Sequence, residues 1–329
     1  MLAKFTARIE RWPLARPFRI SRGVRTEAVV TVVEARLGDR VGRGESVPYA
    51  RYGETPESVI EQLAALDQYR PGELTREQLT KLFSPGAARN AIDCALWDLE
   101  AQLAGRTVAQ LIGQPPPRSL TTAVTISIDT PQSMAAAARQ VATSPIIKVK
   151  VDASQPQAAI EAVALAAPNA RLIIDPNESW NIQLLRDLQP FLARLPIAFI
   201  EQPLPAAEDA ALRGFKPLVP LCADESLHTT EELSQVADRY QVINIKLDKT
   251  GGLTEALRLL AAARDRKLSV MVGCMMCTSL SIAPALHVAT GADYADLDGP
   301  WWLLKDHERG VRIDSGVLTV PSPFIWGNQ

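Results

Sequence analysis

Short apolar segments alternate with longer Ala- and Leu-rich segments over the last two thirds of the chain. From about residue 120, eight segments have the pattern of buried strands, and segments with helical spacing lie between most of them. The strand candidates are TAVTISI, IIKVKVD, RLIIDPNES, IAFIEQPL, PLCADES, VINIKLDKTGG, LSVMVGCMM and YADLDGP. Alternating strands and helices predict parallel strands, and eight of them predict a closed β/α barrel. The alternative is an open doubly wound sheet, which no Gly-rich nucleotide-binding loop supports.

The first hundred or so residues have a different order of elements. FTARIERWPLA, AVVTVVEARL and GRGESVP predict three strands, which we expect to be antiparallel. One helix is expected to begin after Thr55, and another covers GAARNAIDCALWDLEAQLAG and ends at Gly105. Strands followed by helices are typical of an α+β unit. We therefore predict an α+β domain over residues 1–115, completed by a β-like tail at 306–329, and a barrel domain over 116–305.

The composition is typical of a globular protein and narrows the range of partners. The chain has 329 residues and a net charge of −2, so neither nucleic acid nor an anionic membrane is expected as a partner. Residues 268–292 contain no Asp, Glu, Lys or Arg, but their proline, histidine and hydroxyl groups favour a buried strand and helix over a membrane span. Charges from Lys4 onward argue against a signal peptide. The four cysteines are expected to be reduced thiols in a cytoplasmic protein.

Most of the predicted barrel strands end in an ionisable residue. These residues are Lys150, Asp175, Glu201, Asp224 and Lys246 on the second to sixth strands, and Asp296 and Asp298 on the eighth. The C-terminal ends of parallel barrel strands open on one face, so we expect these side chains to meet in a single pocket. One such Asp alone would more often be a solvated loop charge. Consecutive strands that all end this way argue against that interpretation.

Three carboxylates on successive strands predict a metal site. Asp175, Glu201 and Asp224 would repel one another unless a cation lies between them. Oxygen ligands without imidazole or thiolate fit Mg²⁺, with Mn²⁺ as an alternative. Lys150 and Lys246 end strands on opposite sides of the barrel, so they can remove a proton from one face of a carbon and return one to the other. This is epimerisation next to a carboxylate, and Mg²⁺ would stabilise the enediolate that forms.

Lys148 lies two positions before Lys150 and therefore points to the same face of the strand. We expect Lys148 to pair with the substrate carboxylate and, together with the metal, to lower the pKa of Lys150 so that Lys150 acts as a base. The alternative is a strand edge on which lysines prevent aggregation. The carboxylates at the ends of the neighbouring strands favour the functional interpretation.

These residues resemble the enolase superfamily, whose members combine an α+β capping domain with a modified (β/α)7β barrel. The KxK of the second strand and the lysine of the sixth are similar to the muconate lactonizing enzyme subgroup. SRGVRTEA, YARYGET, DPNESW, EQPLP, CADES, NIKLDKTGGLTEAL, GCMMCTS and ADLDGP resemble the dipeptide epimerases, especially those that act on L-Ala-D/L-Glu. The resemblance implies metal ligands at Asp175, Glu201 and Asp224, acid/base lysines at Lys150 and Lys246, and substrate binding by Asp296 and Asp298.

The implied reaction is a Mg²⁺-dependent epimerisation of dipeptides such as L-Ala-D-Glu or L-Ala-L-Glu, with a role in the recycling of murein peptides. The α-ammonium of a dipeptide would pair with Asp296 and Asp298, which share one strand face. On local sequence alone, an Asp-Gly turn is the alternative interpretation of DLDG. The side-chain carboxylate of the substrate needs a cation, and Arg22 and Arg25, in a predicted loop between the first two strands, are the candidates, with Arg22 slightly preferred.

Three further residues and two alternative functions complete the expectations. Thr125 and Cys274 are expected to line the pocket, with a small buried residue as the alternative for Cys274. Asn177 is expected to orient the carboxylates. An o-succinylbenzoate synthase or cycloisomerase of the same fold would not need the aspartate pair, and a non-catalytic dipeptide-binding protein would not need two opposed lysines. Members of the superfamily often assemble, so a homo-oligomer is compatible with the resemblance.

Overall fold

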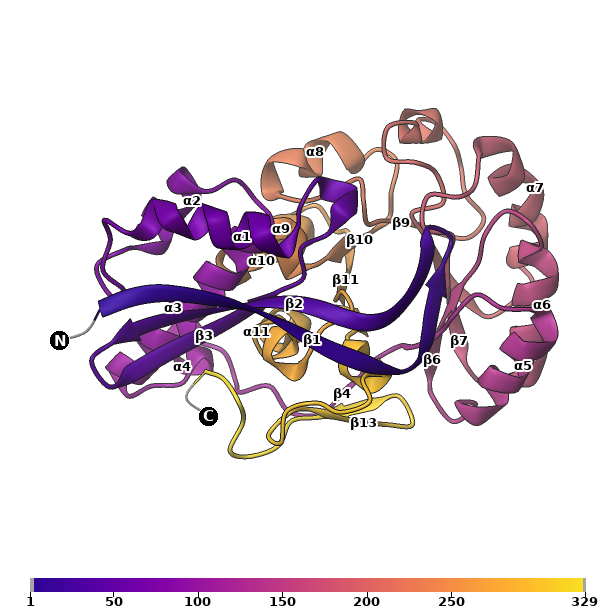
Figure 1. The fold of residues 1–329 in the computed structure, drawn as a ribbon. Coiled ribbons are helices and arrows are strands. Elements are labelled where there is room, and N and C mark those ends of the chain that lie inside the picture. The colour runs from indigo at the N-terminus through magenta and orange to yellow at the C-terminus, as the bar shows by residue number, and fades with distance from the viewer. Residues whose placement is uncertain (1–2, 328–329) are drawn as a thin grey trace.

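The computed structural model describes residues 3–327 and contains three β-sheets (Figure 1). Residues 1–2 and 328–329, which fall in the predicted first domain and the predicted tail, lie outside the described residues. The N-terminal sheet has the antiparallel order β1-β2-β3, with β1 at Ala3–Ile20, β2 at Gly23–Leu37 and β3 at Arg40–Ser46. Helices α1 (Pro56–Leu63), α2 (Arg76–Leu82), α3 (Ala87–Ala104) and α4 (Val108–Ile112) follow. The predicted α+β order is confirmed.

The prediction that SRGVRTEA forms a loop between the first two strands is wrong. β1 and β2 form one long hairpin whose tip is only Ser21 and Arg22, with Ile20 paired to Gly23 and Phe18 paired to Arg25. The polar residues of SRGVRTEA suggested a loop. In an exposed hairpin, however, the backbone pairing satisfies the main chain, and polar side chains can alternate outward.

Helix α3 lies directly against the backbone of β3. A Cβ atom added to Gly42 or Gly44 would come within 2.1 Å of a carbonyl oxygen of α3, so only glycine permits this approach. The helix ends at Gly105, which adopts the left-handed conformation (φ 60°), as the sequence predicts. Thr55 caps α1 through the backbone N–H of Ser58, which also agrees with the prediction. This tight packing gives the N-terminal unit its own hydrophobic core.

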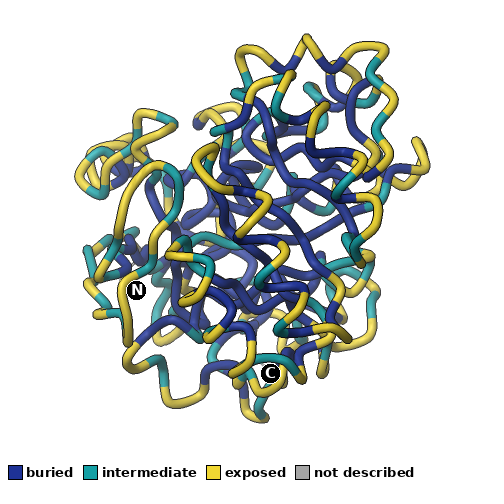
Figure 2. Tube along the Cα trace, turned by 90° about the vertical axis from the view of Figure 1, so that its right-hand side faces the viewer, coloured by how far each residue is buried: buried dark blue, intermediate teal, exposed yellow. Residues whose placement is uncertain are grey.

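The second sheet is an eight-stranded parallel barrel, as predicted. Its strands are β5 (Val124–Ile126), β6 (Ile146–Lys150), β7 (Arg171–Asp175), β8 (Ile197–Glu201), β9 (Leu221–Ala223), β10 (Val242–Ile245), β11 (Ser269–Gly273) and β12 (Tyr294–Asp296). The backbone N–H of Ala123 donates to the carbonyl of Ala295 (2.8 Å) and closes the ring between the first and last strands. Buried residues fill the centre of the molecule, and exposed residues follow the outer loops (Figure 2).

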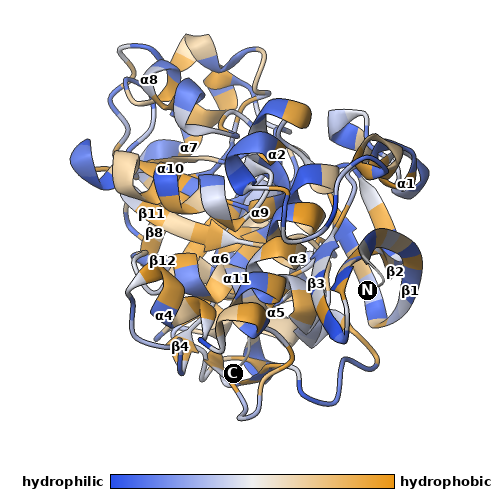
Figure 3. Ribbon diagram, turned by 90° about the vertical axis from the view of Figure 1, so that its left-hand side faces the viewer, coloured by the Kyte–Doolittle hydropathy of each residue, from blue (hydrophilic) through white to orange (hydrophobic). Residues whose placement is uncertain are grey.

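Helices surround the barrel on the outside. They are α5 (Pro131–Gln140), α6 (Pro156–Ala166), α7 (Ile182–Leu192), α8 (Leu233–Val236), α10 (Leu253–Asp265) and α11 (Ser279–Ala289). The short helix α9 (Leu247–Thr250) is buried between the barrel and α3. Hydrophobic residues concentrate along the strands, whereas the outer helices also carry hydrophilic residues (Figure 3). The apolar stretch at 268–292 forms β11 and α11, as predicted. Among the described residues, no helix combines the length and the hydropathy that crossing a bilayer requires.

The C-terminal segment contributes a small third sheet and then returns to the N-terminal unit. β13 (Arg312–Asp314) pairs with β14 (Val317–Thr319), and β14 pairs with β4 (Leu120–Thr121). The indole N–H of Trp326 then donates to the carbonyl of Arg43 (2.8 Å), and the N–H of Gly327 donates to Asp98 Oδ1 (2.9 Å). We retain the boundary at residues 115 and 116 as a proposal and call residues 3–115 the cap.

Buried carboxyl groups join the cap to the barrel. Glu45 of β3 accepts hydrogen bonds from the backbone N–H (2.8 Å) and the hydroxyl of Thr278, which is the N-cap residue of α11. Asp248 of α9 accepts from the N–H of Val47 (2.9 Å) and from Asn90 (2.8 Å). Burial raises the pKa of Glu45 to about 8 and that of Asp248 to about 7. The joint therefore holds acids whose protonated form the folded protein favours.

The substitution Glu45→Gln should flatten the pH dependence of stability. Because the pKa of Glu45 is higher in the folded protein than in the unfolded chain, its contribution is fully present below about pH 4.5 and is lost as the pH rises to about 8. In this range the unfolding free energy of the wild type should fall by up to about 1.4 kcal/mol per pH unit because of Glu45. The variant has no carboxyl group at this position, so its unfolding free energy should not show this decrease. Urea unfolding of both proteins between pH 5 and pH 9 measures the difference. Equal slopes would contradict a protonated Glu45.

Candidate active site

Alternation along the barrel strands places an ionisable layer above an apolar one. Ile173, Phe199 and Cys222 belong to the buried apolar cluster inside the barrel. Two residues further along the same strands come Asp175, Glu201 and Asp224, which therefore point into the barrel nearer its C-terminal end. All three carboxylates are almost completely buried, with at most 2% of each residue exposed.

A cavity of about 480 Å³ opens above this layer, between the strand ends and the cap. The predicted residues that line it are Arg22, Arg25, Thr125, Lys148, Lys150, Asn177, Asp224, Lys246, Cys274, Asp296 and Asp298. Asp175 and Glu201 do not line the cavity, because Lys148 lies against both of them. The structure thus brings all the predicted site residues into one region, with two of the predicted ligands beneath the cavity wall.

Two lysines contact the acidic layer from opposite sides. The ammonium of Lys150, at the end of β6, lies 2.5 Å from Asp175 Oδ2 and 3.1 Å from Asn177 Oδ1. That of Lys246, directly after β10, lies 2.6 Å from Asp224 Oδ2. β7, β8 and β9 separate β6 from β10, so these two strands stand on opposite sides of the eight-stranded barrel. Burial acts to lower the pKa of Lys246. The negative charges of Asp224 and Glu201 outweigh this effect and hold the pKa well above its usual value.

Lys148 occupies the centre of the layer. Its ammonium lies 3.0 Å from Asp175, 2.7 Å from Glu201 and 2.7 Å from Asp296. Burial acts to lower its pKa, yet the three carboxylates raise it well above the usual value. Lys148 was expected to be available for the substrate carboxylate, whereas here it neutralises the acids.

The donor set fits a hard divalent cation, although its groups are not gathered around one point. No three carboxylate, imidazole or thiol groups of residues 3–327 converge closely enough to surround an ion. The ammonium groups of lysines lie against these carboxylates. Glu201 Oε2 and Asp224 Oδ1 are buried and accept no hydrogen bond, although each has a lysine ion pair at 2.7 Å. Carboxylate oxygens are the ligands that Mg²⁺ prefers.

The aspartates at the end of β12 are only partly free, and they do not share one strand face as expected, because the strand ends at Asp296 and Asp298 begins the following short helix. Asp296 Oδ2 pairs with Lys148, and its Oδ1 is buried without a hydrogen bond. Asp298 Oδ2 accepts from the backbone N–H of Thr125 (2.7 Å) and from the indole of Trp302 (3.3 Å). Burial, and then the charge of Asp296, raise the pKa of Asp298 to about 6. Asp296 thus offers the better acceptor for an ammonium group, while Asp298 also fixes the strand end.

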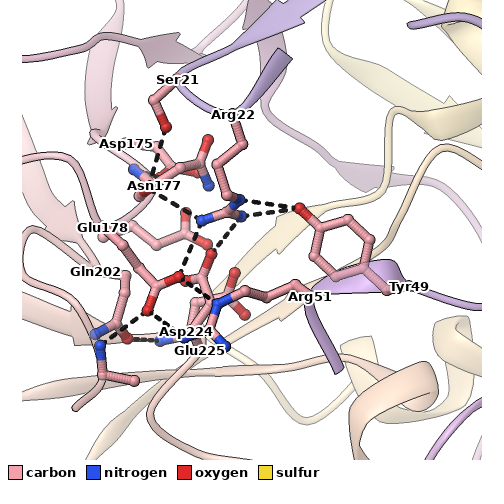
Figure 4. A network of polar contacts seen from close by, with 12 residues as sticks. Ser21, Arg22, Tyr49, Arg51, Asp175, Asn177, Glu178, Gln202, Asp224 and Glu225 are labelled. Carbon is pink, nitrogen blue, oxygen red and sulfur yellow. Dashed lines mark hydrogen bonds and ion pairs between the residues drawn. The ribbon is translucent and has the colours of Figure 1, made fainter. Parts of the chain in front are cut away.

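The two candidate arginines differ in the number of protein groups that they already bind. Arg22 donates to Glu225 Oε1 (2.7 Å), to Glu178 Oε2 (3.1 Å) and to the hydroxyl of Tyr49 (2.9 Å) (Figure 4). Arg25 has no ion pair among the described residues and lies over the ring of Tyr49, with 5.4 Å from its guanidinium carbon to the ring centre. Arg22 is therefore already bound by carboxylates of the protein, whereas Arg25 is not.

Several residues of the site were not predicted. Tyr49, Arg51 and Tyr52 line the cavity from the cap, and Glu225 lines it from the barrel. Lys249 is completely buried, and its ammonium lies 2.7 Å from Asp224 Oδ1 and 2.9 Å from the carbonyls of Leu227 and Asn244. The segments YARYGET, CADES and NIKLDKTGG contain all of these residues, but nothing in their spacing indicates which side chains turn inward.

Opposed lysines around clustered carboxylates, at the mouth of a parallel barrel closed by an α+β cap, define an enzyme of acid–base chemistry. The chain belongs to the mandelate racemase and muconate lactonizing enzyme family. The N-terminal domain model of that family matches residues 3–113, and the enolase C-terminal domain-like model matches residues 133–323. The predicted superfamily and fold are therefore confirmed.

Individual relatives are similar over nearly the whole chain. The L-Ala-D/L-Glu epimerase of Escherichia coli is 47% identical over 311 residues, which cover 94% of this chain and 97% of that protein. The N-acetyl-D-glutamate racemase of a Pseudoalteromonas species is 42% identical over 288 residues, covering 87% and 91%. Among solved structures, an enolase family member from Agrobacterium tumefaciens with bound sodium and L-Ala-L-Glu has a TM-score of 0.96 at 46% identity, covering 99% and 100%. A dipeptide epimerase from Methylococcus capsulatus with Mg and L-Arg-D-Lys has a TM-score of 0.87 at 32% identity, covering 99% and 98%.

Proposed function

We propose that this protein is a Mg²⁺-dependent epimerase of dipeptides of the L-Ala-D/L-Glu type. One observation carries the proposal: Lys150 and Lys246 contact the acidic layer from opposite sides of the barrel. The E. coli relative, which is an L-Ala-D/L-Glu epimerase, and the similar structures with bound dipeptides support the substrate class. A lyase or a binding protein would not require two opposed amines.

The lysines would act on the α-carbon of the C-terminal residue of the dipeptide. One of them, as a neutral amine, removes the proton from its own side, and the ammonium of the other delivers a proton to the opposite face. Mg²⁺ held by Asp175, Glu201 and Asp224 would withdraw negative charge from the substrate carboxylate and so make the α-proton more acidic. Because either lysine can begin the reaction, the same site accepts both stereoisomers.

Recognition of the two ends of the substrate falls to different parts of the site. Asp296 Oδ1, buried and without a hydrogen bond, would accept the α-ammonium of the dipeptide. Arg25, which lies beside Tyr49 and has no ion pair among the described residues, would meet the side-chain carboxylate. Thr125 and Cys274 would line the space between them. A substrate with a positive N-terminal end and a negative side chain therefore fits best.

Incubation of L-Ala-D-Glu with the protein and Mg²⁺ in D₂O should introduce deuterium at the α-carbon of Glu, together with epimerisation. N-acetyl-D-glutamate carries the same carboxylates without the ammonium, so it is the matched control substrate. We expect kcat/KM to be lower for it by about 10- to 100-fold, the loss expected when the buried Oδ1 of Asp296 keeps no hydrogen-bond partner. Proton NMR follows both reactions. Absence of exchange with every dipeptide would refute the epimerase function, and a preference for the acetylated substrate would refute the ammonium subsite.

We also place the reaction in the turnover of murein peptides in the cytoplasm. L-Ala-D/L-Glu is the substrate named for the E. coli relative. The four cysteines are free thiols in the structure, which agrees with a reducing compartment.

A further inference from the structure

Glu178 has no role in the proposed chemistry. At the cavity mouth its carboxylate accepts hydrogen bonds from two arginines of the cap, Arg22 and Arg51. Arg51 donates to its two carboxylate oxygens at 2.9 Å each, and Arg22 donates to Oε2 at 3.1 Å (Figure 4). The backbone N–H of Ala206, in the loop after β8, donates to Oε1 at 2.8 Å. These residues, with Asn177, are called the Glu178 cluster below. Only 9% of the Glu178 side chain is exposed, so the cluster differs from an ordinary surface ion pair.

The turn that carries Glu178 has a backbone that only its contacts can hold. Asn177 and Glu178 both have positive φ angles, 46° and 67°, which side chains other than glycine adopt at a cost of about 1 kcal/mol or more each. The N–H of Glu178 donates to the carbonyl of Gln202 (2.9 Å). The carbonyl of Asn177 accepts from the hydroxyl of Ser21 (3.1 Å) and from Arg22 (3.0 Å), both at the tip of the cap hairpin. The cap and the turn therefore stabilise each other.

The same turn contacts the groups of the proposed chemistry. Asn177 Oδ1 accepts from the ammonium of Lys150 (3.1 Å), and the N–H of Asn177 donates to Asp175 Oδ1 (2.9 Å). A change in the conformation of this turn would therefore move a hydrogen-bond partner of Lys150 and one of Asp175. On its other side, the turn holds the hairpin tip and the loop of Arg51, next to Arg25 and Tyr49.

We infer that Glu178 is a positioning residue that links the position of the cap over the cavity to the placement of Lys150 and of the substrate side chain. The inference rests on the proposed function. Glu178 touches neither the reacting carbon nor the metal ligands. It fixes the hairpin tip over the cavity through Arg22 and the loop of residues 50–52 through Arg51, and it holds Asn177 in the left-handed turn. Substrate affinity and the orientation of the base thereby depend on a group outside the reaction centre.

The substitution Glu178→Gln tests this inference, with Asp293→Asn as the matched control. Asp293 also accepts from an arginine (Arg264, 2.7 Å) and from a backbone N–H (Val270, 2.8 Å), but it lies outside the cavity. In the Glu178 variant, KM for L-Ala-D-Glu should rise about tenfold or more, as expected for loss of charge-assisted hydrogen bonds, with a smaller effect on kcat. The control should keep its KM. A purely structural role would lower the melting temperature and leave KM unchanged, which would overturn the inference.

The double variant Glu178→Gln/Arg51→Ala tests whether Glu178 acts through the cap. If it does, KM of the double variant should be no higher than that of the worse single variant, because both changes remove the same link. If the KM of the double variant rose by the product of the two single effects, Glu178 would act independently of Arg51. That result would overturn the inferred link between Glu178 and the cap. Wild-type activity is measured in parallel: an inactive wild type refutes the proposed function, whereas an active wild type with an unaffected Glu178 variant refutes only this inference.

Discussion

Lys150→Ala and Lys246→Ala should each reduce epimerisation by about three orders of magnitude, the middle of the range for loss of a general acid or base. Proton exchange should separate the two variants. Each remaining lysine still reaches the α-proton on its own side, so each variant should exchange the proton of one stereoisomer and fail with the other. The measurement is deuterium incorporation from D₂O into L-Ala-L-Glu and L-Ala-D-Glu, assayed separately.

A lysine outside the site provides the control for these variants. Lys81 pairs with Glu77 on an exposed face of α2, with 73% of its side chain exposed, and Lys81→Ala should leave exchange unchanged. Both active-site variants are expected to fold, because Asp175 keeps its contact with Lys148 and Asp224 keeps its contact with Lys249. If one variant lost exchange from both stereoisomers and the other lost neither, a mechanism with a single base would replace the one proposed.

Removal of divalent cations with EDTA should abolish exchange, and Mg²⁺ should restore it. Mg²⁺ should also raise the melting temperature, because it binds the folded acidic layer and not the unfolded chain. The expected gain is about 2.7 kcal/mol of unfolding free energy at a Mg²⁺ concentration one hundred times the Kd. Calorimetric unfolding at several Mg²⁺ concentrations measures this effect independently of turnover.

Glu201→Gln should remove most of that stabilisation. The substitution preserves shape, and the new amide oxygen can still accept the hydrogen bond from Asn244 (2.8 Å) that Glu201 Oε1 accepts now. Glu45→Gln removes another buried carboxyl group away from the cavity and should retain the full response to Mg²⁺. A wild-type melting temperature that is independent of Mg²⁺ would show that the acidic layer is balanced by its lysines alone.

The barrel and its acidic layer could be predicted because they follow from local periodicity. Asp175, Glu201 and Asp224 each end an apolar strand, and parallel strands must bring such ends together whatever the detailed packing. The helix ends at Thr55 and Gly105 could also be predicted, because each depends only on residues within one helical turn. Nothing beyond neighbouring residues and strand direction was needed for these predictions.

The parts that depend on long-range contacts could not be predicted. The polar stretch from Ser21 to Ala28 looks like a loop, because its strand pairing depends on backbone partners and not on an apolar face. The choice between Arg22 and Arg25 depends on Glu178 and Glu225, which lie more than 150 positions further along the chain. Lys249 offered no signal, because a lysine in a short helix is expected on the surface. Only the folded chain shows that it is buried against Asp224.

The origin of the side chains around the cavity has a consequence for redesign. The proposed acid–base lysines and metal ligands come from barrel strands, whereas Arg25, Tyr49 and Arg51 come from the hairpin and loop of the cap. Exchanging cap residues other than Arg22 and Arg51, while retaining the barrel, should therefore change which dipeptides are accepted and leave proton transfer intact. Libraries aimed at new side-chain preferences can be confined to a few positions near residues 20–25 and 49–52, provided that the anchoring arginines are kept.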